Sequence, residues 1–124
     1  MQVAVLVCTY KRPLGLKKLV ASLAQQSLPE GIEPILCLAD NNPTSEQHGY
    51  IKAAMQDFPW RWLYRHETKR GYASARNASL DLALSKTQAE LLCITDDDEV
   101  VPQTWIKDLV AGIQEFDCQV IVGA

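Results

Sequence analysis

The sequence predicts an α/β fold, with a Rossmann-like and mostly parallel sheet covered by helices on both faces. Two observations lead to this prediction. Short runs of Val, Ile and Leu alternate along the chain with segments whose apolar residues recur every three or four positions. The first run, at residues 3–8, is apolar throughout, which is typical of a strand buried on both faces of a parallel sheet. The chain has 124 residues, which is enough for one domain with a single core.

The first half of the chain predicts two strand–helix units. A polar turn containing a proline ends the first strand, and apolar residues on one helical face then predict a helix over 14–26. A second apolar run predicts a strand at 35–39. Thr44 or Ser45 is a suitable cap for a weaker helix that ends near Gln56.

The second half continues the same alternation. An aromatic run predicts a strand at 60–64, and helical spacing of leucines predicts a helix over 74–85. A short apolar strand follows at 91–94. The pattern at 104–116 predicts an amphipathic helix, and residues 120–122 predict a last strand.

Composition narrows the class of protein. The 12 basic and 15 acidic side chains give a net charge of −3, so we expect no nucleic-acid partner. The four cysteines lack the spacing of a zinc site, and three lie in strand-like runs, so we expect buried thiols in a reducing compartment. No apolar stretch approaches the ~20 residues of a membrane span. We expect a cytoplasmic protein, with peripheral attachment to a membrane left open.

Four consecutive carboxylates, Asp96 to Glu99, directly follow the apolar run at 91–94. Two such charges ~4 Å apart repel each other by about 1 kcal/mol even in water. A cluster of this kind is therefore expected where water solvates it or a cation neutralises it. Taken alone, the run fits a solvated acidic loop and a Mg²⁺ or Mn²⁺ site equally well.

The fold itself favours the metal site. Ligands of parallel α/β sheets bind beyond the carboxyl ends of the strands, where Thr9, Asp40 and Asp96 are expected to meet. A diphosphate chelated to Mg²⁺ or Mn²⁺ by Asp96 and Asp98 would balance the charges of both groups. Arg76 would add positive charge near the same edge.

Simpler interpretations of these residues stay open. Thr9 could satisfy a turn, and Asp40 could form an Asx-turn with Asn42. Arg76 could be a solvated helix residue. His66 is isolated from any nucleophile in the sequence, and we expect it on the surface.

Four motifs, in the correct order, resemble those of family 2 glycosyltransferases with the GT-A fold. Residues 5–13 resemble the family's opening strand and its Pro-Thr-Tyr-Asn-Arg turn, and residues 38–42 resemble the Val-Asp-Asn segment. Residues 71–77 resemble the Gly-x-x-x-Ala-Arg-Asn helix start, and residues 94–99 resemble the Asp-x-Asp-Asp metal motif. The departures are Cys8 for Pro, Lys11 for Asn, Ser79 for Gly and Glu99 for Asp.

The resemblance implies a transferase that takes a sugar from a nucleotide-diphosphate sugar, most often with inversion. A UDP-sugar is the expected donor, and the acceptor is unknown. The resemblance implies that Thr9 and Asp40 hold the base and that Arg76 supports the nucleotide pocket.

The acidic run takes its roles from the same resemblance. Asp96 or Asp97 would meet the ribose, and Asp98, together with Asp96, would ligate Mg²⁺ or Mn²⁺. The cation would stabilise the charge that builds on the leaving diphosphate. A carboxylate would deprotonate the acceptor hydroxyl, but in this family it comes from the acceptor-binding half of the enzyme. No catalytic base is therefore assigned.

We expect residues 1–124 to form a single GT-A nucleotide-sugar-binding domain that is truncated before the acceptor-binding half. The alternative is a non-catalytic nucleotide-sugar-binding fragment or a truncated gene product. In either case an unpaired sheet edge would favour a homo-oligomer. A receiver domain and a Gly-rich dinucleotide fold are disfavoured, because neither an acid pair nor Gly-x-Gly-x-x-Gly follows the first strand.

Overall fold

The computed structural model describes residues 1–44 and 48–116. It contains a four-stranded sheet in the order β3-β2-β1-β4, and every neighbouring pair is parallel. The strands are β1 (Gln2–Thr9), β2 (Glu33–Asp40), β3 (Arg61–His66) and β4 (Leu91–Asp96). The helices are α1 (Pro13–Ala24), α2 (His48–Met55), α3 (Tyr72–Lys86) and α4 (Trp105–Phe116). Strands and helices alternate, which confirms the predicted α/β architecture.

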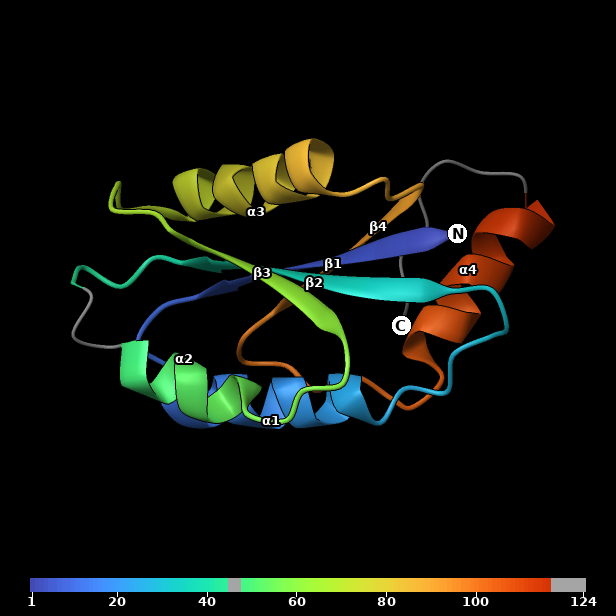
Figure 1. Ribbon diagram of the computed structural model, residues 1–124, viewed down its shortest axis with the longest axis horizontal. Coiled ribbons are helices and arrows are strands. Elements are labelled where there is room, and N and C mark those ends of the chain that lie inside the picture. Colours follow the sequence, from blue (N-terminus) through green and yellow to red (C-terminus); the bar gives the residue numbers. More distant parts are fainter. Residues whose placement is uncertain (45–47, 117–124) are drawn as a thin grey trace.

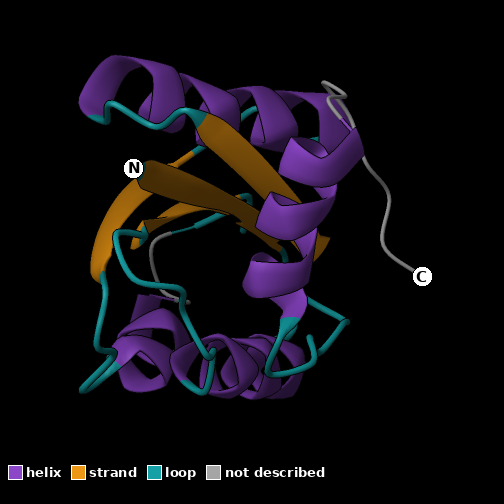
Figure 2. Cartoon of the chain, turned by 90° about the vertical axis from the view of Figure 1, so that its right-hand side faces the viewer, coloured by secondary structure: helices purple, strands orange, loops and turns teal. Residues whose placement is uncertain are grey.

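The helices form layers on the two faces of the sheet. Helix α3 covers one face, and α1 and α2 cover the other (Figure 1). Helix α4 runs along one side of the molecule, from the layer of α1 toward that of α3 (Figure 2). No helix in the described ranges has the length and hydropathy needed to cross a membrane.

Strand β1 shows how the sequence builds this core. Side chains alternate between the two faces of a strand. Val3, Val5 and Val7 accordingly pack into the cluster shared with α1, while Ala4 and Leu6 pack into the cluster under α3. Both faces are covered, so the whole run had to be apolar.

Helix α1 contributes one buried stripe, at the helical spacing that the sequence indicates. Pro13 begins the helix, where its missing N–H costs nothing. Leu16, Leu19 and Leu23 are fully buried. Each buried leucine stabilises the fold by roughly 1.5–3 kcal/mol.

Strand β3 ends two residues later than predicted. It was expected at 60–64 but runs from Arg61 to His66, because pairing with β2 continues as far as Asp40 opposite His66. The predicted last strand at 120–122 and the predicted cap Ser45 lie outside the described residues. Within the described residues, the thiols of Cys8, Cys37 and Cys93 are free; Cys37 and Cys93 are buried as expected, whereas Cys8 is half-buried.

Candidate functional site

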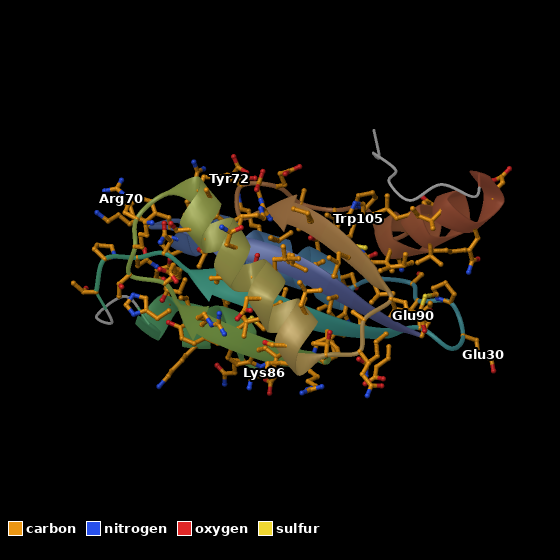
Figure 3. The ribbon with its side chains drawn as sticks, turned by 90° about the horizontal axis from the view of Figure 1, so that it is seen from above. Glu30, Arg70, Tyr72, Lys86, Glu90 and Trp105 are labelled. Carbon is orange, nitrogen blue, oxygen red and sulfur yellow. The ribbon has the colours of Figure 1, made fainter. Side chains whose placement is uncertain are left out.

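The register of the sheet brings the predicted site residues to one edge. Thr9 is paired with Asp40, and Cys8 is paired with Asp96, so β1, β2 and β4 end at the same level. In Figure 3, Arg70 and Tyr72 lie at the end of α3 nearest the arrowhead of β4, and Lys86 lies at the opposite end. The expectation that the polar segments share this edge is therefore confirmed.

Three of the four consecutive carboxylates form one cluster. Asp96, Asp98 and Glu99 each offer one oxygen, and these oxygens all lie within 4.8 Å of one another. The side chain of Glu99 also folds back, and its carboxylate accepts a 3.3 Å hydrogen bond from the N–H of Asp96. Oxygen donors at this spacing fit Mg²⁺ or Mn²⁺, which prefer hard carboxylate ligands.

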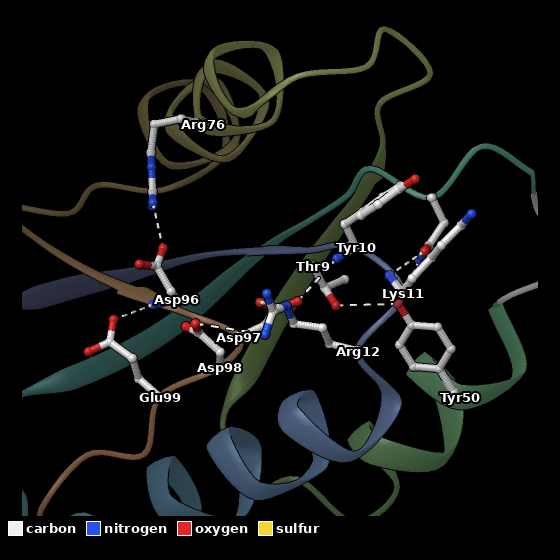
Figure 4. Close-up of polar contacts among 11 residues, drawn as sticks. Thr9, Tyr10, Lys11, Arg12, Tyr50, Arg76, Asp96, Asp97, Asp98 and Glu99 are labelled. Atoms are coloured by element: carbon white, nitrogen blue, oxygen red, sulfur yellow. Dashed lines mark hydrogen bonds and ion pairs between the residues drawn. The ribbon is translucent and has the colours of Figure 1, made fainter.

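Asp97 points away from this cluster. Its Oδ2 accepts a 3.1 Å hydrogen bond from the N–H of Tyr10, and its Oδ1 lies 3.6 Å from Nε of Arg12 (Figure 4). Burial raises the pKa of Asp97, although the N–H of Tyr10 and the hydroxyl of Thr9 partly offset this effect. Asp97 thus ties the end of β4 to the turn after β1. A contact between Asp97 and the nucleotide stays a prediction.

Strand β4 ends at Asp96, and Asp97 and Asp98 lie in the turn that follows. The alternation of side chains along a strand does not extend into a turn, so the sequence pattern alone could not separate Asp97 from the other carboxylates.

Asp40 is fully buried. Its Oδ1 accepts hydrogen bonds from the N–H of Asn42 at 2.9 Å and from Nδ2 of Asn42 at 2.7 Å. Its Oδ2 accepts a 2.6 Å hydrogen bond from the hydroxyl of Tyr64. The Asx-turn considered for Asp40 is therefore present. Burial, together with Asp40, raises the pKa of Tyr64.

Thr9 is also buried, and its Oγ1 lies 3.3 Å from the hydroxyl oxygen of Tyr50 on α2. That hydroxyl accepts a 2.6 Å hydrogen bond from Nδ2 of Asn42. His66 is half-buried, with Nε2 2.8 Å from the carbonyl oxygen of Asn42, so the expectation of a surface histidine was wrong. Tyr50 and Tyr64 were not predicted as site residues, because nothing in the spacing of lone tyrosines marks them as partners of a strand end.

Arg76 is not a solvated helix residue. Only 16% of its side chain is exposed, and its Nη2 lies 3.1 Å from Oδ1 of Asp96. Its guanidinium carbon lies 4.9 Å from the centre of the Tyr72 ring. The other terminal nitrogen, Nη1, is buried without a hydrogen-bond partner in the described part of the chain. A buried donor of this kind is suited to an acceptor supplied by a ligand.

Further positive charge lies beside Tyr10. The guanidinium carbon of Arg70 is 4.4 Å from the centre of the Tyr10 ring, and Nζ of Lys11 is 5.3 Å from it. Asn41 holds the loop that carries Arg70, because its Nδ2 donates to the carbonyls of Glu67 and Lys69. Basic groups from two separate turns therefore gather at the edge.

Gly15 allows α1 to approach the acidic run closely. A Cβ atom at this position would overlap the carbonyl oxygen of Asp97. The glycine is inside a helix, where it costs up to about 1 kcal/mol relative to alanine. Its presence is explained by this contact, which the sequence alone does not reveal.

A separate shallow hollow lies between α2 and β3. Its volume is about 450 Å³, and its lining includes Lys52, Met55 and Trp62. None of the predicted site residues lines it. The chemistry of the sheet edge is therefore the stronger indication of function.

The fold is that of the GT-A glycosyltransferases. It matches the mannosyltransferase PcManGT from Pyrobaculum calidifontis, solved in complex with GDP-Man and Mn²⁺, with a TM-score of 0.73 and 23% identity. That match covers 90% of this chain and 32% of the other. The S. aureus TarS 1–349 structure in complex with UDP matches with a TM-score of 0.72 and 24% identity, over 93% of this chain and 32% of that one.

Residues 4–124 match the model of Glycosyl transferase family 2, and the chain belongs to this family. It is 28% identical over 117 residues to the succinoglycan biosynthesis protein ExoM of Rhizobium meliloti (strain 1021), covering 94% of this chain and 36% of ExoM. It is 30% identical over 123 residues to the glycosyltransferase GlyG of Streptococcus pneumoniae serotype 4 (strain ATCC BAA-334 / TIGR4), covering 98% of this chain and 38% of GlyG. The chain thus spans little more than a third of the length of these relatives.

Proposed function

We propose that residues 1–124 are the nucleotide-sugar-binding part of a glycosyltransferase that moves a sugar from a nucleotide-diphosphate sugar to an acceptor hydroxyl. The donor is a UDP-sugar, transfer inverts the sugar, and Mg²⁺ or Mn²⁺ is required. The single observation that carries the proposal is the cluster of Asp96, Asp98 and Glu99 at the carboxyl end of β4. Two structural neighbours support this class of ligand, because one was solved in complex with UDP and the other in complex with GDP-Man and Mn²⁺.

The charges around the cluster suit an anionic ligand that brings its own cation. Arg76 lies 3.1 Å from Asp96, and Arg12 lies 3.7 Å from Asp98. These guanidinium groups partly neutralise the carboxylates and can also bind phosphate oxygens. Among the described residues, Nη1 of Arg76 has no hydrogen-bond partner, so it adds a buried donor that a nucleotide could satisfy.

Each part of the edge has a task in this proposal. Asp98 and Asp96 hold the divalent cation, which when bound stabilises negative charge on the diphosphate leaving group. Thr9 and Asp40 form the base-binding end of the edge, with their side chains fixed by Tyr50 and Tyr64. Asp97 holds the end of β4 against the turn after β1, and Arg76 links α3 to Asp96 at the end of β4. The catalytic base is assigned to no described residue.

Calorimetric titration of UDP-, GDP- and dTDP-sugars, with and without Mn²⁺, tests the proposal. We expect a UDP-sugar to bind more tightly than the others and only when Mn²⁺ is present. Asp98→Ala removes one cluster oxygen and should abolish the effect of Mn²⁺ on binding. The matched control is Asp81→Ala, because Asp81 pairs with Arg65 outside the cluster.

Two results would contradict the proposal. One is binding of the wild-type chain that does not depend on the metal. The other is an equal loss of Mn²⁺-dependent binding in Asp81→Ala and in Asp98→Ala, since this would indicate a general loss of structure.

The second candidate is a nucleotide-sugar-binding module without turnover. The chain covers 36% and 38% of its two curated relatives, and no described residue is assigned as the catalytic base. Both candidates predict donor binding, so turnover separates them. Release of UDP from a bound UDP-sugar, measured for the chain alone and for a longer chain encoded at the same locus, would decide between them.

A further inference from the structure

Arg12 has a position that its place at the start of α1 does not explain. It directly precedes α1, and its carbonyl oxygen accepts a 2.9 Å hydrogen bond from the N–H of Leu16. Its side chain makes no capping hydrogen bond to the helix. The guanidinium instead reaches across to the acidic run, between Asp97 and Asp98 (Figure 4).

The two carboxylates depend on Arg12 to different degrees. Asp97 has other donors, the N–H of Tyr10 and the hydroxyl of Thr9, and only 11% of its side chain is exposed. Asp98 has one ion pair among the described residues, with its Oδ2 3.7 Å from Nη1 of Arg12, and 52% of its side chain is exposed. Arg12 therefore restrains Asp98 more than it supports Asp97.

Asp98 has two competing uses. The carboxylate that faces Arg12 also contributes an oxygen to the cluster with Asp96 and Glu99. A guanidinium and a divalent cation at one carboxylate repel each other. The Arg12 contacts of 3.6 and 3.7 Å are longer than hydrogen bonds, and 56% of the side chain is exposed, so little holds it in place.

We propose that Arg12 couples binding of the divalent cation to binding of the diphosphate. Without ligands it pairs with Asp98 and lowers the affinity of the cluster for the cation. When the nucleotide diphosphate binds, the guanidinium of Arg12 turns its planar fork of N–H donors from Asp98 to phosphate oxygens. This proposal rests on the proposed function, and it names Arg12 as a diphosphate-binding residue of that site.

The coupling has a signature that a structural role would not produce. Removing the guanidinium removes a competitor of the metal and, at the same time, a ligand of the diphosphate. The two affinities must therefore change in opposite directions. Loss of structure would weaken both.

The experiment measures the affinities of the wild type and of Arg12→Gln for three ligands. These are Mn²⁺ alone, UDP at saturating Mn²⁺, and uridine. We expect Mn²⁺ alone to bind Arg12→Gln about two- to fivefold more tightly, because an exposed ion pair is lost. We expect UDP to bind about tenfold more weakly, and uridine, which has no phosphate, to bind as before. Arg12→Lys keeps the charge without the fork, so its Mn²⁺ affinity should match the wild type while UDP binding is weakened.

Arg65→Gln is the matched control, because Arg65 forms a 2.6 Å ion pair with Asp81. Arg65 lies on β3, the outer strand on the side of the sheet opposite β4. It should leave all three affinities unchanged. Arg12→Gln with unchanged affinities, or with Mn²⁺ and UDP both weakened, would overturn the proposal for Arg12 while leaving the proposed function standing. A wild-type chain that binds neither Mn²⁺ nor UDP would instead contradict the proposed function, and the Arg12 proposal with it.

Discussion

The side-chain oxygen of Asn42 accepts a 2.7 Å hydrogen bond from the N–H of Lys11, which joins the turn after β2 to the turn after β1. The amide nitrogen of the same side chain donates to Asp40 and to Tyr50. Asn42 is fully buried, so water cannot replace these partners. One asparagine therefore fixes the relative position of the two turns that border the candidate site.

Asn42→Ala should lower the free energy of unfolding by about 1–3 kcal/mol, because buried partners lose their hydrogen bonds. Urea unfolding followed by circular dichroism measures this change. Asn77→Ala is the control, since Asn77 is exposed on α3 and its replacement should change stability by less than about 0.5 kcal/mol. Equal effects of the two substitutions would show that Asn42 does not link the turns.

Lys11 has a φ of 49°, in the left-handed region that suits Asn or Gly better than Lys. Lys11→Asn should therefore be more stable than Lys11→Ala by about 1 kcal/mol. Both variants lose the contact of Lys11 with the Tyr10 ring. The difference in stability between them therefore reports the cost of the left-handed backbone conformation. Thermal unfolding of the two variants measures it, and identical midpoints would argue against strain at this position.

Gly15→Ala should destabilise the protein by about 1–3 kcal/mol, because the added methyl group would overlap the carbonyl oxygen of Asp97. Gly49→Ala is a matched control in α2, where nothing lies within 4 Å of the new atom. It should stabilise the protein by up to about 1 kcal/mol. We therefore expect chemical denaturation to show a lower free energy of unfolding for Gly15→Ala and a higher one for Gly49→Ala. A change of the same sign in both variants would be inconsistent with the close approach of α1 to Asp97.

Burial raises the pKa of Cys37 and of Cys93 from 9.0 to about 11, with Arg61 partly opposing the effect at Cys37. An acid whose pKa is higher in the folded state stabilises that state below its unfolded pKa and loses this contribution as the pH rises. The stability advantage of the wild type over the Cys37→Ala/Cys93→Ala variant should therefore shrink between about pH 9 and 11. Urea unfolding from pH 7 to pH 11 tests this. A constant difference across that range would contradict it.

Strand β4 pairs only with β1 among residues 1–44 and 48–116. Its side chains Leu92 and Ile94 are exposed. We expect the chain to self-associate through this edge, as unpaired strands with apolar side chains do. Size-exclusion chromatography at increasing concentration should show a dimer that Ile94→Lys weakens and the control Leu14→Lys does not. A monomer at every concentration would rule out this oligomer.

The sequence predicted the fold well because burial on both faces leaves a strong local pattern. The apolar runs of β1 and β2 and the leucine stripe of α1 are each visible without tertiary information. The end of β3 was missed because its pairing with β2 extends the strand beyond its aromatic run. Pairing of this kind depends on a partner that is distant in the sequence.

By itself, the sequence determined the parallel α/β architecture, the edge at which polar residues meet and the resemblance to family 2 glycosyltransferases. Only the tertiary structure separated Asp97, which holds the turn after β1, from the cluster of Asp96, Asp98 and Glu99. Only the tertiary structure brought Arg12 between two of these carboxylates. The physical reason is range: periodicity acts between neighbouring residues, whereas charge pairing joins side chains that the fold alone brings together.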